Sequence, residues 1–137
     1  MRTIELTTAL DAPAQHAWQV LLDVDRWPEW GVLVVSAEGR FAPGARWTMH
    51  LRDGRRMRPT LITVEPTRLV FETYLGHRRW VCMQHSFQVE ELDAKRSMLR
   101  QRFEVRGVLV PVLWRALSRG MRQFDELGCD LARRVTT

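Results

Sequence analysis

Cysteine is scarce in this sequence. The chain has two, Cys82 and Cys129, which are too few for a disulfide framework and lack the spacing of metal ligands. Long apolar runs are missing too, since no segment approaches the roughly twenty apolar residues needed to span a bilayer. The first residues, from Met1 to Glu5, lack the pattern of a secretory signal and run directly into an alternating segment. We therefore expect a cytoplasmic protein with no membrane span.

Lysine is nearly absent as well. Lys95 is the only one, although Lys and Arg together number 21 and the formal net charge is +5. The arginines are dispersed along the chain among acidic residues, which does not favour a nucleic-acid-binding surface. The densest basic cluster, Arg52 to Arg58, contains the turn signal Asp53-Gly54 and is interpreted as a solvated hairpin tip. We expect no nucleic-acid partner.

No strong catalytic signature occurs. The chain has no glycine-rich phosphate loop, no nucleophile elbow, no HExxH sequence and no pair of carboxylates at catalytic spacing. Its four histidines include no pair with the spacing of zinc ligands. Neither a metal nor a cofactor is expected, and any enzymatic activity would depend on side chains that line a cavity.

The composition fits one globular domain. The chain has 137 residues, of which 45% are hydrophobic and 27% charged, enough for a single sizeable core. No internal repeat or low-complexity segment divides it. Residues 1–137 are therefore expected to form one domain.

The strongest periodicity lies between Gly107 and Val135. At 100° per residue, one narrow face is apolar and the opposite face carries Arg115, Arg122 and Arg133. The pattern predicts one helix of about 25 residues and about 37 Å, with Pro111 in its first turn. Its apolar face should be buried against strands, and it comprises Leu109, Leu113, Leu117, Met121, Phe124, Leu127, Leu131 and Val135.

Period-two alternation dominates the rest of the chain. It predicts a first strand at residues 4–10, a helix at 13–24 with Asp11 as N-cap, and a helical turn at 25–30 in which two tryptophans anchor the segment on a sheet. The remaining strands are predicted at residues 34–40, 46–52, 58–65, 69–75, 80–92 and 97–106, with a break at Pro66-Thr67. In the last of these, Leu99, Gln101, Phe103 and Val105 share one face, and charged residues take the other. The order predicts an α+β fold with a meandering antiparallel sheet around one terminal helix.

The order of several short motifs resembles the START/pollen-allergen (SRPBCC) superfamily, particularly its polyketide cyclase/dehydrase-like branch. The motifs are Leu10-Asp11-Ala12-Pro13, Ala17-Trp18, Leu21-Leu22-Asp23, Trp27-Pro28-Glu29-Trp30, Pro43-Gly44-Ala45-Arg46-Trp47, Val64-Glu65-Pro66, Leu69-Val70-Phe71, His85-Ser86-Phe87 and the helix after Gly107. The resemblance covers essentially the whole chain. It implies a helix-grip fold, in which a curved sheet of about seven antiparallel strands wraps around the long C-terminal helix. It also implies a cavity between sheet and helix, in which members bind lipids, sterols, quinones or polyketides and some catalyse cyclisation or dehydration.

His85 is the candidate catalytic residue, because it is predicted to point inward from the middle of a long strand. There an imidazole can exchange a proton with a bound enol or carbonyl near neutral pH. The alternative is a structural histidine whose hydrogen bond is satisfied by a neighbour such as Gln101. Gln101 and Thr8 are candidates to orient a ligand oxygen, or else to form a satisfied polar pair in the core.

The other candidate ligand-binding residues are apolar. Four aromatic residues are predicted to form one wall of the cavity, or simply the core: Trp30, Trp47, Phe71 and Phe103. The helix is expected to contribute Leu117, Met121 and Phe124. Gly120 and Gly128 also lie on or beside its apolar face, and they leave either space for a ligand or room for close contact between helix and sheet.

Three functions of different classes are compatible with these features. The first is binding or carriage of a hydrophobic small molecule, because the implied cavity is apolar with few polar groups. The second is a cyclase, aromatase or dehydratase-like enzyme that uses acid or base residues of the cavity. The third is a protein-interaction module whose cavity is vestigial. In each case the chain is expected to be a monomer or a homodimer.

Overall fold

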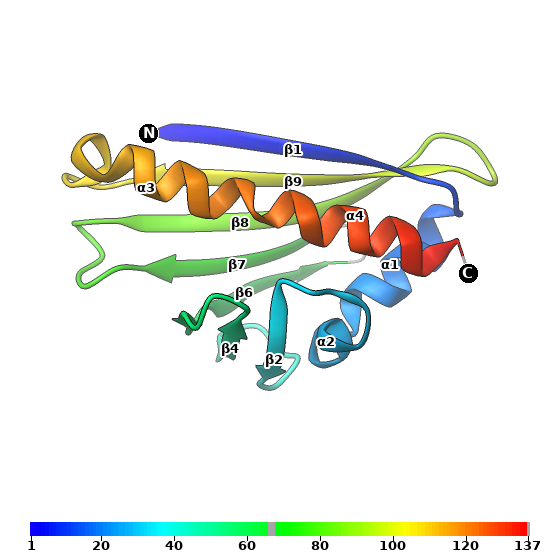
Figure 1. Ribbon diagram of the computed structural model, residues 1–137, viewed down its shortest axis with the longest axis horizontal. Coiled ribbons are helices and arrows are strands. Elements are labelled where there is room, and N and C mark those ends of the chain that lie inside the picture. The colour runs from blue at the N-terminus through cyan, green and yellow to red at the C-terminus, as the bar shows by residue number, and fades with distance from the viewer. Residues whose placement is uncertain (66–67, 137) are drawn as a thin grey trace.

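The computed structural model describes residues 1–65 and 68–136. It consists of two antiparallel sheets, short helices after the first strand, and a long helical segment at the C-terminus (Figure 1). The larger sheet has six strands in the order β1-β9-β8-β7-β6-β3, and the smaller has three in the order β2-β4-β5. The predicted α+β class and helix-grip arrangement are confirmed. The predicted break at Pro66-Thr67 lies outside the described residues.

The strands of the large sheet are β1 (Arg2–Leu10), β3 (Ala45–Arg46), β6 (Thr60–Glu65), β7 (Arg68–Tyr74), β8 (Cys82–Glu91) and β9 (Ser97–Arg106). Those of the small sheet are β2 (Val34–Glu38), β4 (Thr48–Leu51) and β5 (Arg56–Met57). The register places Phe71 beside His85 and His85 beside Phe103 on three neighbouring strands. In β9 the predicted alternation is confirmed, because Leu99, Gln101, Phe103 and Val105 are buried while Arg102 and Arg106 are exposed.

The sheet divides at Trp47, where one continuous strand was predicted. Trp47 separates β3 from β4, and its backbone N–H donates to the Pro59 carbonyl oxygen at 2.8 Å. Its indole is buried and packs over Gly39, where an added Cβ would lie 2.5 Å from the ring. The chain therefore passes from one sheet to the other around a buried side chain.

The helices after β1 are shorter than predicted. Helix α1 spans Ala14–Leu22, and it begins at Pro13 without a side-chain cap; the prediction of Asp11 as its N-cap is therefore wrong. A short 3₁₀ turn, η1 (Val24–Arg26), leads into α2 (Trp27–Trp30). The predicted anchoring of α2 is confirmed for Trp27, whose ring lies edge-on to Phe71 and Phe87 at centroid distances of 6.2 and 5.4 Å.

The C-terminal helix is bent and divided in two, although one continuous helix was predicted. It consists of α3 (Val110–Arg122) and α4 (Phe124–Val135), joined by Gln123, whose backbone keeps helical angles (φ −62°, ψ −24°). The bend lies one turn after Gly120, and the Gln101 amide donates to the Phe124 carbonyl oxygen there at 2.9 Å. Gly120, a weak helix former, and a hydrogen bond from the sheet are therefore both found near the bend.

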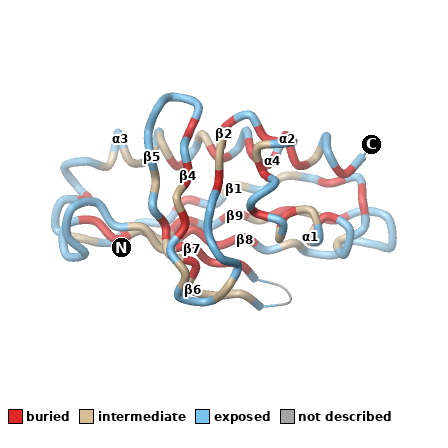
Figure 2. Tube along the Cα trace, turned by 90° about the horizontal axis from the view of Figure 1, so that it is seen from below, coloured by how far each residue is buried: buried red, intermediate tan, exposed pale blue. Residues whose placement is uncertain are grey.

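The bend gives the two helices different surroundings. Helix α4 packs along β1, and its apolar residues Phe124, Leu127 and Leu131 are buried as predicted. Leu109 and Leu113 are exposed and Leu117 is only half-buried, so the prediction that these three are buried is wrong. Figure 2 shows most of α3 in the colours of exposed and intermediate residues. Leu113 and Leu117 are less buried because α3 covers a cavity rather than a packed sheet surface, and Leu109 lies at the end of the helix as its N-cap. The predicted exposure of Arg115, Arg122 and Arg133 is confirmed.

Candidate functional site

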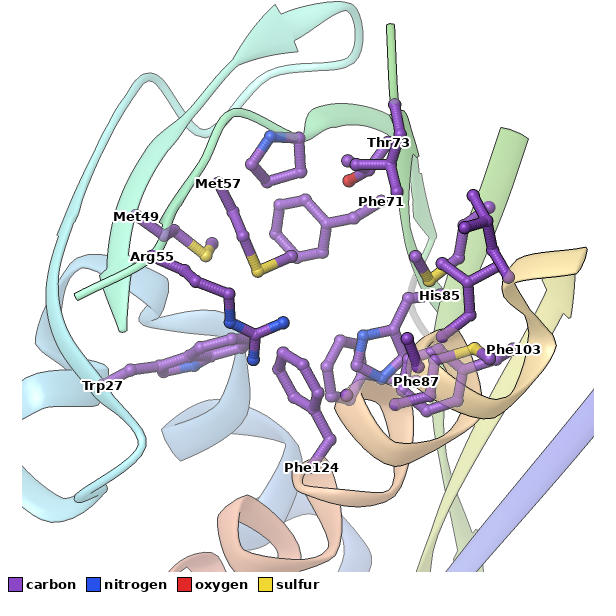
Figure 3. Close-up of a pocket in the computed structure, with 18 residues that line it drawn as sticks. Trp27, Met49, Arg55, Met57, Phe71, Thr73, His85, Phe87, Phe103 and Phe124 are labelled. Atoms are coloured by element: carbon purple, nitrogen blue, oxygen red, sulfur yellow. The ribbon is translucent and has the colours of Figure 1, made fainter. Parts of the chain in front are cut away.

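A cavity of about 300 Å³ lies between the large sheet, α2, α3 and the β4–β5 hairpin (Figure 3). Its wall is mostly aromatic and aliphatic, and among the described residues its polar side chains are Arg55, Thr73 and His85. The lining residues are Trp27, Met49, Arg55, Met57, Pro59, Phe71, Thr73, Leu75, Met83, His85, Phe87, Phe103, Leu113, Ala116, Leu117, Gly120, Met121 and Phe124. Such a composition is typical of small-molecule sites.

Seven of the twelve predicted ligand-binding residues line this cavity. They are Phe71, His85, Phe103, Leu117, Gly120, Met121 and Phe124. The other five are absent from its wall: Thr8, Trp30, Trp47, Gln101 and Gly128. Trp30 lies beside Trp27, with ring centroids 6.3 Å apart, and Gln101 lies one layer behind His85. Trp47 borders a separate surface depression next to Val24 and Phe41.

The two glycines of the helix have different surroundings. A Cβ on Gly120 would lie 3.2 Å from Arg55 Nη1, the end of a flexible side chain at the edge of the cavity. A Cβ on Gly128 would lie 2.3 Å from Thr8 Oγ1 and 3.4 Å from Gln101 Nε2. Gly120 therefore borders ligand-sized space, whereas Gly128 allows close contact between α4 and the sheet.

His85 is held among three aromatic rings. Its imidazole stacks on Phe103 with a centroid distance of 3.9 Å, lies 4.1 Å from the Phe87 ring and meets Phe124 edge-on at 4.8 Å. The register of β8 and β9 explains the first contact, because His85 and Phe103 are paired across the two strands. These rings exclude water from one side of the imidazole.

A chain of two hydrogen bonds fixes the tautomer of His85. The Phe124 carbonyl oxygen can only accept, so the Gln101 amide NH₂ donates to it, at 2.9 Å. The Gln101 carbonyl oxygen then faces His85 Nε2 at 2.9 Å, and His85 Nε2 must carry the proton that it donates. His85 Nδ1 therefore keeps a free lone pair, for which the described part of the chain supplies no hydrogen-bond partner. Because His85 lines the cavity, that lone pair is a hydrogen-bond acceptor available to a ligand.

Burial lowers the pKa of His85 from 6.5 to about 3, and the hydrogen bond with Gln101 only partly opposes this shift. The imidazole is neutral at pH 7 and has little tendency to take a proton. Its geometry suits hydrogen-bond acceptance better than proton exchange near neutral pH. The predicted alternative of a histidine satisfied by Gln101 matches the hydrogen bond that is seen.

Arg55 is the main residue of the cavity that the sequence did not single out. It follows the Asp53-Gly54 turn, and its guanidinium donates to Asp53 at 2.7 Å and to Gln123 Oε1 at 2.8 Å. Arg52 pairs with Glu126 at 2.9 Å, so the β4–β5 hairpin is held to the helix at the bend and in the first turn after it. Figure 3 shows the Arg55 guanidinium directed into the cavity between Trp27 and Phe124. The sequence of a basic turn does not show whether its hairpin packs on a helix or extends into solvent.

Three methionines in β4, β5 and β8 gave a weaker indication of the cavity in the sequence. Met49, Met57 and Met83 all line the cavity, and flexible thioether side chains often fill adaptable apolar surfaces. Within residues 1–65 and 68–136, no group of three His, Cys, Asp or Glu side chains is placed to hold a metal ion. Over the same ranges, no helix is both long and apolar enough to cross a membrane.

One known family matches nearly the whole chain. The family model described as polyketide cyclase/dehydrase and lipid transport matches residues 1–133. The chain belongs to this family. Membership of the family, with the START-like fold, supports a role either in binding a hydrophobic ligand or as a cyclase. It does not select between these two roles. The comparison with curated proteins found no match.

Solved structures share the fold of this polyketide cyclase/dehydrase family member at low sequence identity. A norcoclaurine synthase from Thalictrum flavum, in complex with a transition-state analogue, is 12% identical with a TM-score of 0.80, over 98% of this chain and 94% of that one. The di-domain ARO/CYC protein BexL from the BE-7585A biosynthetic pathway is 18% identical with a TM-score of 0.77, over 99% of this chain and 47% of BexL. A START superfamily protein from Mycobacterium smegmatis is 13% identical with a TM-score of 0.73, over 98% and 97%.

Proposed function

We propose that this protein binds an apolar, ring-containing small molecule that carries a hydroxyl group, with the hydroxyl donating to His85 Nδ1. The observation that supports this most directly is the free acceptor of a buried imidazole in a wall that is almost wholly apolar. Nδ1 is not among the fully buried side-chain atoms that lack a partner, and His85 lines the cavity, so a donor on the ligand can bond to it without displacing a protein group. The aromatic rings around His85 favour a flat ligand, because such rings stack or meet edge-on.

Binding is favoured over catalysis by the titratable groups of the cavity. Among the described residues that line it, there is no Asp, Glu, Lys, Cys or Tyr. Arg55 is a permanent cation, and the low pKa of His85 makes its imidazole a weak base. A cyclase or dehydratase reaction would therefore require a substrate whose own proton is already acidic. The alternative of a protein-interaction module with a vestigial cavity gains no support from a cavity of this volume and composition.

Isothermal titration calorimetry with two matched probes tests the proposal. We expect 2-naphthol to bind the wild-type protein about fivefold more tightly than 2-methoxynaphthalene, because only the former donates a hydrogen bond, and a neutral one contributes about 1 kcal/mol. In His85→Phe the two probes should bind equally, because the acceptor is gone while the aromatic wall remains.

Leu117→Trp is the control for location. It places a larger side chain in the cavity from the half-buried face of α3, so it should weaken both probes alike. If the wild-type protein binds neither probe, or if Leu117→Trp binds both as tightly as the wild type, the cavity is not the binding site. If the hydroxyl preference survives in His85→Phe, the assignment of His85 as acceptor is wrong.

A further inference from the structure

More than half of the exposed large apolar side chains in the described residues lie at one end of the molecule. Twelve large hydrophobic residues of the described ranges are exposed, and seven of them lie either at the end of β7 and in the loop after it or at the start of α3. Val112 is 81% exposed, Val108 73% and Trp80 50%. The seven are Tyr74, Leu75, Trp80, Val108, Leu109, Val112 and Leu113. We refer to them as the apolar end.

The two segments of the apolar end are joined directly. The backbone N–H of Val108 donates to the Arg79 carbonyl oxygen at 2.9 Å, and that of Leu109 donates to the Trp80 carbonyl oxygen at 3.1 Å. Figure 1 shows the β7–β8 loop and the beginning of α3 at the same end of the molecule, away from α1 and α2. The side chains therefore form one surface rather than isolated exposed residues.

The unpaired charge around this surface is positive, since the adjacent Glu72 is paired with Arg78. Residues 73–89 and 105–124 contain no aspartate or glutamate. In the described chain no carboxylate is paired with Arg79, Arg106, Arg115 or Arg119. Arg115 and Arg119 follow Val112 at spacings of three and seven, so they lie on the same outward face of α3. Although the arginines are dispersed over the whole sequence, the fold collects unpaired ones around the apolar end.

The apolar end is also continuous with the cavity. Leu75 and Leu113 are exposed at this end and line the cavity as well. A ligand passing between these side chains would move from the outer surface to the aromatic wall along apolar groups. The surface is thus placed where an apolar ligand would enter.

We propose that the apolar end docks on a lipid bilayer that contains anionic phospholipids. Exposed valine, leucine and tryptophan insert into the boundary between headgroups and acyl chains, and arginines bind the phosphates. A second copy of this chain fits poorly, because two-fold contact would place unpaired arginines opposite one another. The docking goes beyond ligand binding, and it can be measured on the protein without any ligand.

Co-sedimentation of the full chain with large vesicles tests the proposal. The wild-type protein should sediment with vesicles of phosphatidylcholine containing roughly a third phosphatidylglycerol, and far less with phosphatidylcholine alone. Val112→Glu should reduce the bound fraction severalfold. The control Val35→Glu places the same charge at an exposed position of β2, and it should bind as the wild type does.

A second pair of variants separates the charge contribution. Arg115→Gln with Arg119→Gln should weaken binding to the anionic vesicles roughly 30-fold, whereas Arg40→Gln with Arg68→Gln should change it little. Equal binding by all variants, or equal sedimentation with both kinds of vesicle, would overturn the proposal. So would self-association in the absence of vesicles that Val112→Glu abolishes.

The naphthol titration distinguishes this proposal from the proposed function. Val112→Glu should keep the wild-type affinity for 2-naphthol, because Val112 is outside the cavity lining. A protein that binds 2-naphthol but no anionic vesicle would refute only the docking. A protein that binds vesicles but no naphthol would refute only the ligand assignment.

Discussion

Replacing Gly128 with alanine is expected to destabilise the protein, although alanine is the better helix former. An ideal Cβ at this position would lie 2.3 Å from Thr8 Oγ1 and 3.3 Å from Thr8 Cβ. Thr8 belongs to β1, and its β-branched side chain has few alternative rotamers. Helix α4 or strand β1 must therefore shift, which as overpacking costs about 1–3 kcal/mol.

The helix propensity of alanine opposes this cost by about 1 kcal/mol. A double-mutant cycle with Thr8→Ala separates the two contributions, because it removes Oγ1 and leaves the helix unchanged. In the Thr8→Ala background, Gly128→Ala should be about 1–3 kcal/mol less harmful than in the wild type. Urea unfolding followed by tryptophan fluorescence gives the four free energies.

Gly120→Ala is the matched control on the same helical segment. Its Cβ would meet only the end of the Arg55 side chain, at 3.2 Å, which can move into solvent. We expect this variant to gain about 0.5–1 kcal/mol. Close packing of Gly128 on Thr8 is refuted if Gly128→Ala is as stable as Gly120→Ala, or if Thr8→Ala leaves the effect of Gly128→Ala unchanged.

Three further outcomes follow from the packing and charges. Phe124→Ala should lose about 3 kcal/mol on urea unfolding, at the low end for a buried phenylalanine because one side of the ring borders the cavity; a loss below about 1 kcal/mol would show that the ring is not packed. The His85 pKa of about 3 lies below its unfolded value of 6.5, so as the pH is lowered the unfolded chain takes up this proton before the folded chain does. The free energy of unfolding therefore decreases by about 1.4 kcal/mol for each unit that the pH is lowered below about 6.5. The corresponding difference in slope between wild type and His85→Phe should appear in urea unfolding at several pH values, and parallel curves would contradict the burial of His85. Arg52→Ala breaks an ion pair whose side chains are both 48% exposed, so it should cost less than about 1 kcal/mol in the same assay.

The sequence by itself determined the elements with strong local periodicity. Strand β9 has the predicted bounds, Ser97–Arg106, and its buried face is the predicted one. A two-residue period needs no knowledge of distant partners, because alternate side chains of a strand always point to opposite faces. The same reasoning placed His85 and Phe87 inward on β8, and the helical period placed Phe124 and Leu131 on the buried face of α4.

Only the tertiary structure decided which inward residues reach the cavity. Gln101 and Phe103 share one face of β9, yet Phe103 lines the cavity and Gln101 lies behind His85. Likewise, Gly120 and Gly128 belong to one helical stripe, but the bend at Gln123 leaves the first over the cavity and brings the second against Thr8. The periodicity of the sequence predicts the direction in which a side chain points. The distance to the opposite helix or strand then decides whether the side chain borders the cavity or packs against other atoms.

The position of Arg55 and the clustering of the unpaired arginines are also tertiary properties. Arg55 reaches the cavity because its hairpin is bonded to the distant C-terminal helix. Arg55 bonds to Gln123, which is 68 positions later in the chain, and Arg52 bonds to Glu126, which is 74 positions later. Arg79 and Val108 are far apart in sequence and are joined by a backbone hydrogen bond. Electrostatic and apolar surfaces depend on distances in space, and a sequence fixes those distances only through the complete set of contacts that folds it.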